Sequence, residues 1–165
     1  MSYSVERSHE RVTSLCRLRT GDGLFGIEAS AVREALDRYE LREIPRAPKF
    51  VAGVLAYRGE VLLAVSFRAL LGIAPGVEAS VAVVLRDTET GELFALLVDE
   101  LLDVAAVADS AWEPNPATLD ERSGLLFSGI YRTPDAPLVW LKPQHLQPSW
   151  LMKHIDSALQ IGEWR

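Results

Sequence analysis

A run of glycines near the start of the chain has the spacing of a dinucleotide-binding motif. Residues Gly21–Gly26 (GDGLFG) match G-x-G-x-x-G, and in dinucleotide folds such a run opens a helix whose N-terminal amides bind the pyrophosphate. Here Phe25 and Ile27 are instead typical of the returning strand of a hairpin. We therefore favour a hairpin turn and keep a nucleotide-binding enzyme as a remote alternative.

Side chains that serve as nucleophiles, general bases or metal ligands are scattered. The chain has three histidines and one cysteine, and no histidine has a second ligand at the spacing of a metal site. No histidine is placed by the sequence to activate Cys16, so we expect an inert thiol. The acidic group of Asp99, Glu100 and Asp103 is more typical of a solvated turn than of acid–base chemistry. We expect no catalytic residues, no metal and no cofactor.

Arg58 is the residue that we single out for binding. It lies in a tight turn between two strongly apolar runs, where a guanidinium can pair with a carboxylate or with backbone carbonyls. On spacing alone, an ordinary turn arginine is an equally good interpretation. The apolar content of 48% and the four tryptophans would supply an apolar contact surface or simply fill the core.

Length, net charge and cysteine content exclude several classes of protein. A chain of 165 residues suits one domain or two small subdomains that share a core. The net charge is -6 and no segment concentrates lysine and arginine, which argues against nucleic acid as a partner. One cysteine excludes an internal disulfide. The apolar runs are short and the N-terminus lacks a secretory core, so we expect a cytoplasmic protein without direct membrane insertion.

Short strands separated by turn signals dominate the predicted elements, which indicates a mainly β protein of the small-barrel kind. A short helix is predicted after the first hairpin, because Ser30 suits an N-cap and Val32, Ala35, Leu36 and Tyr39 share one helical face. A helical turn and a long polar connection are also predicted. The predicted segments are strands at 12–19, 24–27, 51–57, 61–66, 81–85, 93–98, 101–107, 130–131 and 138–141, the helical turn at 67–71 and the connection at 109–123.

The domain organisation follows from these elements. Residues 1–11 are polar and are expected to form a flexible lead, and residues 12–147 form the β-rich domain. Residues 148–165 are predicted to form an amphipathic helix with Leu151 and Ile155, together with Ala158 and Leu159, on one side. We expect this helix to pack on the barrel rather than bind a partner.

The order of several segments resembles the CheW family of chemotaxis coupling proteins. The resemblance covers about residues 12 to 147 and is most specific where a proline-rich approach, an internal glycine and an Arg-Gly turn follow one another. The segments that carry it are Val32–Leu36, Ile44–Gly59, Val61–Arg68, Val81–Leu85, Ala95–Val104, Ser128–Ile130 and Leu138–Leu146.

This resemblance implies a fold of two intertwined SH3-like β-barrels and a non-catalytic role. Proteins of this family are adaptors that bridge the cytoplasmic tips of chemoreceptors and the regulatory domain of a CheA-type histidine kinase. The receptor helix tip docks in an apolar groove between the barrels. A protein with this role would be cytoplasmic and recruited to membrane-associated receptor arrays.

The resemblance also implies a set of partner-binding positions. Arg58 and its neighbours match the family's Arg-Gly turn, two valines match apolar strand positions near the groove, and Asp99 matches an acid that is equally well explained by a structural role. The partner-binding residues implied are Val32, Glu34, Gly53, Arg58, Gly59, Val81, Val84 and Asp99.

Departures from the family pattern lie beside the Arg-Gly turn. Ala56 and Tyr57 stand where the family usually has Asn-Leu, and Leu63 and Ser66 stand where it usually has proline and aspartate. These changes suggest a divergent paralogue in a non-flagellar pathway, such as twitching motility or surface sensing. They also leave open a decoy that binds the kinase but not receptors.

Overall fold

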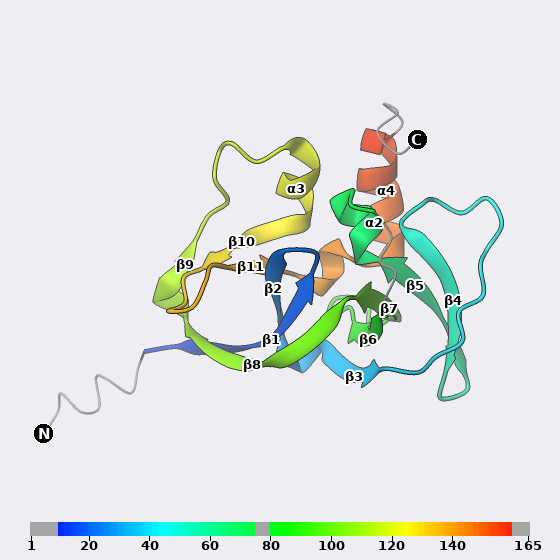
Figure 1. Cartoon of the computed structure of the whole chain (residues 1–165), viewed down its shortest axis with the longest axis horizontal. Helices are drawn as coiled ribbons and strands as arrows, with labels where there is room; N and C mark the ends of the chain where they lie inside the picture. Colours follow the sequence, from blue (N-terminus) through cyan, green and yellow to red (C-terminus); the bar gives the residue numbers. More distant parts are fainter. Residues whose placement is uncertain (1–9, 75–79, 160–165) are drawn as a thin grey trace, which may run out of the picture.

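The computed structural model describes residues 10–74 and 80–159, with side chains to residue 155, as two β-sheets with helices beside them (Figure 1). The elements in chain order are β1 (Val12–Thr20), β2 (Gly23–Glu28), β3 (Val32–Leu36), β4 (Val51–Tyr57), β5 (Glu60–Ser66), α2 (Phe67–Leu71), β6 (Val81–Arg86), β7 (Leu93–Val98), β8 (Glu100–Ala108), β9 (Trp112–Glu113), α3 (Glu121–Leu126), β10 (Phe127–Tyr131), β11 (Leu138–Leu141) and α4 (Pro148–Leu159).

The chain builds one sheet, leaves it to build the other, and then returns. The first sheet has the strand order β8-β1-β2-β11-β10-β9, and the second has the order β3-β6-β7-β5-β4. Strands β3 to β7 are therefore inserted between the two halves of the first sheet. The mainly β fold of two intertwined SH3-like barrels is confirmed, and the glycine-rich run forms the β1–β2 hairpin.

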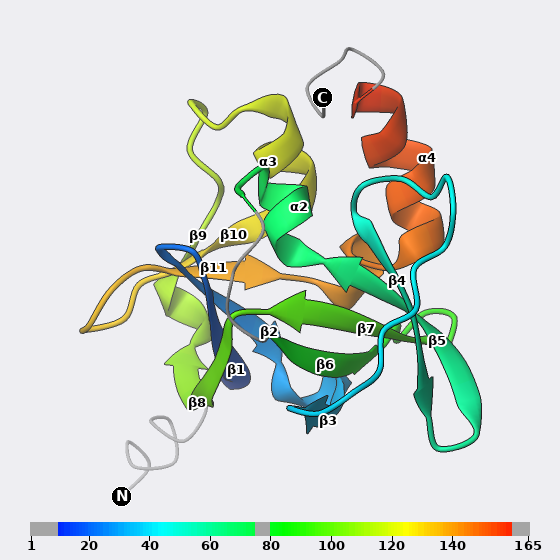
Figure 2. The ribbon, with the colours of Figure 1, turned by 45° about the vertical axis from the view of Figure 1, so that its right-hand side comes forward.

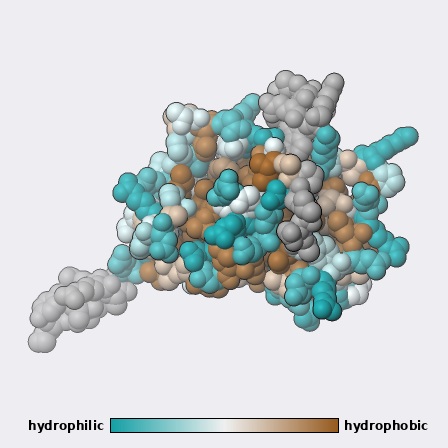
Figure 3. Space-filling model, in the orientation of Figure 1, coloured by the Kyte–Doolittle hydropathy of each residue, from teal (hydrophilic) through white to brown (hydrophobic). Residues whose placement is uncertain are grey.

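One apolar core holds the two sheets together. Its buried side chains come from strands of both sheets and from α2 and α4, because each sheet has one face that must be removed from water. Phe25 of β2 meets Phe67 of α2 edge to face, with ring centroids 4.8 Å apart. Hydrophilic side chains cover much of the face in Figure 3, with apolar residues visible in its middle.

The short helix predicted from Ser30 is wrong. A 3₁₀ turn over Ala29–Ala31 is followed by strand β3, which pairs antiparallel with β6. Along β3, half-buried and exposed residues alternate, so burial repeats every two residues, as in a strand, and not every 3.6 residues, as in a helix. Of the apolar residues that suggested a helix, Val32 and Leu36 also fit a strand, whereas Ala35 is exposed and Tyr39 lies beyond β3. Pairing with β6 provides backbone hydrogen bonds for this segment.

The long connection predicted at 109–123 contains structure that the sequence did not indicate. Two residues form β9 at the edge of the first sheet, and α3 begins at Glu121. Helix α3 is short and contains Gly124, a residue of low helix propensity. Packing against α4 and β10 therefore accounts for it better than local preference does.

The predicted C-terminal helix forms and packs on the domain. Helices α2, α3 and α4 lie on the same side of the sheets in both views of the ribbon (Figures 1 and 2). Leu151 and Ile155 are fully buried in the main core, whereas Ala158 and Leu159 lie beyond the described side chains. At the helix start, the Gln147 side-chain oxygen accepts a hydrogen bond from the backbone N–H of Trp150 at 3.1 Å.

We expect Leu151→Ala to destabilise the protein by about 2–5 kcal/mol, because it opens a cavity in a core that cannot fully collapse. The neighbouring Met152 is 41% exposed, so Met152→Ala is the matched control and should change the free energy of unfolding little. Urea unfolding of the three proteins measures both values. Equal effects of the two substitutions would mean that α4 does not pack as described.

Candidate functional site

The turn between β4 and β5 holds Arg58 in an unusual backbone conformation. Arg58 has φ +48° and Gly59 has φ +81°, and two positive φ angles are what a two-residue type I′ hairpin requires. Asparagine and glycine suit such a turn, whereas other residues in this region cost about 1 kcal/mol or more. An arginine kept at this position despite its conformational free-energy cost indicates that the side chain has a functional role.

The Arg58 side chain forms a polar cluster with two other residues. Its Nη2 donates to Glu34 Oε1 at 2.9 Å, and the Tyr57 hydroxyl donates to the same oxygen at 3.0 Å. The guanidinium also lies 5.5 Å from the centroid of the Tyr57 ring. Strand β3 supplies Glu34 from a distant part of the chain. We call Glu34, Tyr57 and Arg58 the hairpin-tip cluster.

Electrostatics favour the charged forms of this cluster. The Arg58 guanidinium, and next the Tyr57 hydroxyl, hold the pKa of Glu34 below its ordinary value. The carboxylate in turn raises the pKa of Arg58. The Arg58 side chain is 73% exposed and that of Glu34 is 37% exposed, so a partner can reach both.

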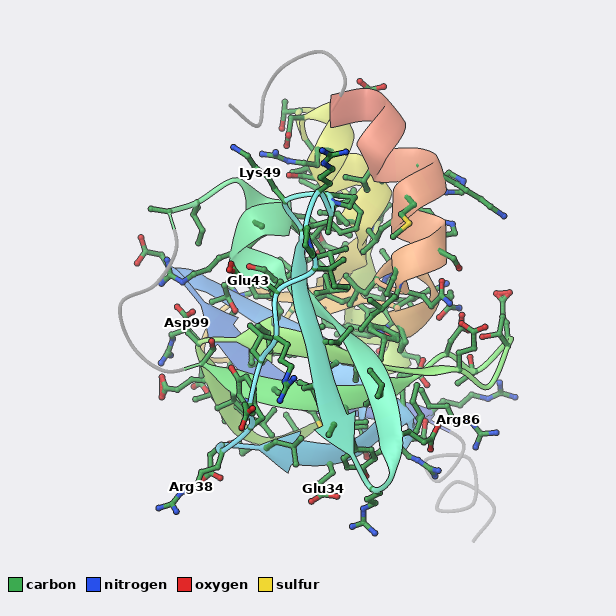
Figure 4. The ribbon with its side chains drawn as sticks, turned by 90° about the vertical axis from the view of Figure 1, so that its right-hand side faces the viewer. Glu34, Arg38, Glu43, Lys49, Arg86 and Asp99 are labelled. Carbon is green, nitrogen blue, oxygen red and sulfur yellow. The ribbon has the colours of Figure 1, made fainter. Side chains whose placement is uncertain are left out.

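The hairpin-tip cluster lines an open hollow of about 370 Å³ on the surface. Figure 4 shows Glu34 beside the tip of the β4–β5 hairpin. Arginine and glutamate side chains give the hollow both signs of charge, which suits a polar partner surface more than an apolar ligand. The lining residues are Arg33, Glu34, Tyr57, Arg58, Glu60 and Leu93.

Gly53 has a structural reason to be glycine. The loop before β4 runs against the strand, where Arg42 and Val54 exchange backbone hydrogen bonds of 2.9 and 2.8 Å. Gly53 has φ +150°, and a Cβ there would overlap the carbonyl oxygen of Arg42. Gly53 thus holds the loop on the sheet edge and does not lie in the hollow.

We expect Gly53→Ala to destabilise the protein by about 3 kcal/mol or more, since backbone strain and a backbone clash add. Gly59→Ala is the comparison, because Gly59 also has a positive φ but has nothing within 4 Å of a built Cβ. It should cost only about 1 kcal/mol. Chemical denaturation of both variants measures the difference. A smaller loss in Gly53→Ala than in Gly59→Ala would contradict the described packing of the loop.

The three valines implied by the resemblance lie at different depths. Val32 and Val81 are half-buried and pack against the main core. Val84 is fully buried and pairs with Glu34 across β3 and β6. It belongs to the same apolar cluster on which Tyr57 packs. Val84 therefore does not line the hollow, and it affects the hollow only by packing in the cluster that supports Tyr57.

Asp99 lies away from the hairpin-tip cluster (Figure 4), at the junction of β7 and β8. Arg68 binds its carboxylate with two hydrogen bonds of 2.8 and 2.6 Å, and the Gly21 N–H donates to it at 2.9 Å. Arg68 first, and also Gly21, lower the pKa of Asp99. Gly21 belongs to the hairpin of the first sheet, and Arg68 belongs to α2, which joins β5 to β6 of the second sheet. Asp99 therefore connects the two halves.

Sequence reasoning missed Tyr57 as a member of the site. Tyr57 was noted only as a departure from the family pattern, since nothing local indicates that its hydroxyl reaches Glu34. Its place next to a turn with a costly arginine is the one signal that could have drawn attention to it. Of the implied residues, the structure brings together Glu34, Arg58 and Gly59, with Val84 beneath them.

Other chemistry has little support in the described structure. Gly23–Glu28 is a strand, so the glycine run does not open the helix that a dinucleotide motif needs. Among the side chains that the structure describes, those of residues 10–74 and 80–155, no cluster of histidine, cysteine and carboxylate groups is arranged to hold a metal ion. No helix within residues 10–74 and 80–159 is long and apolar enough to cross a membrane.

Comparison with known proteins gives consistent matches. Probable chemotaxis protein CheW of Rhizobium etli is 29% identical over 116 residues, which are 70% of this chain and 75% of that protein. Chemotaxis protein CheW of Rhizobium meliloti is 33% identical over 102 residues, 62% of this chain and 66% of that protein.

Solved structures and a family model extend this similarity. The crystal structure of the scaffolding protein TtCheW from Thermoanaerobacter tengcongensis matches with a TM-score of 0.72 and 20% identity, over 80% of this chain and 90% of that one. At that identity the likeness concerns the fold. The model of the CheW-like domain matches residues 15–149. Since this match spans most of the chain, the protein belongs to the family of CheW-like domains.

Proposed function

We propose that the protein is a non-catalytic adaptor that couples chemoreceptors to a CheA-type histidine kinase in chemosensory signalling. Family membership supports the adaptor class, and two similar proteins are named chemotaxis proteins. One observation indicates which surface would bind the partners: the Glu34–Arg58 ion pair is accessible to solvent. Arg58 lies in a turn whose backbone conformation disfavours arginine.

The proposed mechanism is positional. An adaptor makes and breaks no covalent bond; it holds the receptor tip and the kinase regulatory domain in one geometry and shifts the population of kinase states. A receptor helix would offer apolar anchors at helical spacing, and Arg58 and Glu34 would fix its orientation at the rim. The protein would then act in the cytoplasm, recruited to membrane-associated receptor arrays.

The departures beside the turn support a specialised member of the family. Ser66 caps α2 by accepting a hydrogen bond from the Ala69 N–H at 3.2 Å, a role that aspartate would also fill. Leu63 is half-buried against the core, so it fits the barrel. Ala56 is exposed and Tyr57 is half-buried, so these two departures change the surface beside the turn, and a non-flagellar pathway is our proposal for the partners that require them.

Calorimetric titration tests the proposal. The full chain is titrated with the regulatory domain of a CheA-type kinase from the same genome and, separately, with a receptor signalling-tip fragment. Binding to both partners is the expected result. Binding to the kinase alone would replace the adaptor by a decoy of the same fold, and binding to neither at high micromolar concentration would overturn the proposed function.

A further inference from the structure

Both hydrogen bonds within the hairpin-tip cluster end on one oxygen of Glu34. Tyr57 and Arg58 donate to Oε1 at 3.0 and 2.9 Å. We propose that Tyr57 is a positioning residue for the partner surface: its hydroxyl holds the Glu34 carboxylate in the orientation that pairs with Arg58, so that a partner meets a preformed ion pair. This inference rests on the proposed function and deepens it, because it concerns the same surface.

Tyr57 is well placed to act as an anchor. Its ring is half-buried and packs against the apolar cluster that includes Leu55, Leu62 and Val84. Packing of the ring against this cluster restricts the position of its hydroxyl. The Arg58 side chain is largely exposed and that of Glu34 is partly exposed, and surface pairs of this kind ordinarily lose much of their attraction to side-chain entropy.

A preformed pair changes what binding requires. A side chain that is already ordered does not have to be immobilised when the partner arrives, so less binding free energy is lost. The remaining carboxylate oxygen and the other N–H groups of Arg58 are then aimed at the partner. Leucine, which the family resemblance leads us to expect at this position, has no hydroxyl and could not hold the carboxylate in this way.

Anchoring by Tyr57 also makes the surface less sensitive to acid. A hydrogen bond to the charged form favours that form, so Tyr57 acts with Arg58 to keep Glu34 ionised. The other charged groups that face the hollow are Arg33 on β3 and Glu60 on β5, which offset each other in sign. Without the hydroxyl, Glu34 should take up its proton at a higher pH and the pair should break earlier.

The test compares Tyr57→Phe with the wild type and with a matched control, Tyr39→Phe. Tyr39 packs against the same apolar cluster, and its hydroxyl donates to the Ser80 carbonyl at 3.2 Å without touching Glu34. Carboxyl-carbon NMR of the free proteins follows the titration of Glu34. Calorimetry between pH 4 and pH 7, a range that begins near the ordinary glutamate pKa of about 4.3, follows affinity for the receptor tip and the kinase domain.

In Tyr57→Phe, we expect the Glu34 titration to move to higher pH and affinity for the receptor tip to fall about two- to fivefold, which corresponds to one immobilised side chain. The loss should grow as the pH is lowered. The melting temperature should stay within about 2 °C of the wild type, and Tyr39→Phe should match the wild type in both binding and Glu34 titration.

An unchanged Glu34 titration in Tyr57→Phe would overturn the positioning role, whatever the binding data. A binding profile that superimposes on the wild type at every pH would overturn its relevance to partners. Absence of binding by the wild-type protein would instead reject the proposed function, and the NMR titration, which needs no partner, would still judge the contact between Tyr57 and Glu34.

Discussion

Arg58→Asn should leave the protein as stable as the wild type, or slightly more stable, while lowering partner affinity at least tenfold. Asparagine followed by glycine suits the two positive φ angles of this turn, and the exposed ion pair that is lost contributes little to folding. Arginine is one of the residue types enriched among those that dominate interface energetics, and losing such a residue costs about 1.4 kcal/mol or more, which is tenfold or more in affinity. Thermal melting and calorimetry on the same samples measure the two effects.

A second exposed ion pair provides the control for charge. Arg132 pairs with Glu113, and their side chains are 77% and 43% exposed, close to the values of Arg58 and Glu34. Arg132→Ala should therefore leave receptor-tip binding nearly unchanged. A large drop in the melting temperature of Arg58→Asn, with affinity retained, would show that Arg58 is a structural residue.

Asp99→Asn should destabilise the protein by about 2 kcal/mol at neutral pH, because charge-assisted hydrogen bonds are lost and Arg68 keeps a partner of lower charge. The Asp99 side chain is 29% exposed and accepts hydrogen bonds from Arg68 and Gly21. Asparagine retains the shape of the side chain but replaces one accepting oxygen by an NH2 donor, so the charge is lost together with at least one of the hydrogen bonds from Arg68 and Gly21. Urea unfolding at neutral pH measures the loss.

The contribution of Asp99 should also depend on pH. Its folded-state pKa is lowered, chiefly by Arg68, so its stabilisation is complete above the unfolded-state pKa, about 4, and is lost as the pH falls through the lower folded-state value. The difference between wild type and Asp99→Asn should therefore be constant near neutrality and narrow below about pH 4.

Asp103→Asn is the matched control for this prediction. Asp103 also pairs with an arginine, Arg17, but its side chain is 61% exposed, so solvent screens the interaction. Its substitution should change stability much less than Asp99→Asn. Equal losses in the two variants, or a difference for Asp99 that persists unchanged in acid, would contradict the structural role of Asp99.

Local signals predicted most of the fold. The hairpins at β4–β5 and β6–β7 were found because runs of apolar residues flank turns that contain a glycine. The helix predicted from Ser30 failed because Val32 and Leu36 fit both periods over so short a segment. Its pairing with β6 decides the structure, and that partner lies far along the chain.

The site was only partly predictable for the same reason. Arg58 could be identified as a candidate binding residue because apolar runs flank its turn. The family resemblance pointed to Glu34. The contact between them, and the hydroxyl of Tyr57 on the same carboxylate, depend on the packing of β3 beside the hairpin tip. A match to a family position does not show whether a side chain is buried. Val84 was therefore predicted to bind a partner, although it is fully buried.

The structure also separates two tasks within one small domain. Asp99, with Arg68 and Gly21, ties the two sheets together, whereas the hairpin-tip cluster faces solvent at the end of one sheet. An adaptor that works by position needs both features, since a docking surface conveys geometry only if the body behind it is rigid. Substitutions in the two places should therefore have different signatures.

A bridging measurement tests the adaptor role most directly. The kinase regulatory domain is immobilised, the receptor-tip fragment is supplied in solution, and the amount of fragment retained is followed as the protein is added. We predict that retention rises with the protein and returns to background when Arg58→Asn replaces the wild type. If the protein binds the immobilised kinase domain but retains no receptor fragment, it does not couple the two, and the adaptor account is wrong.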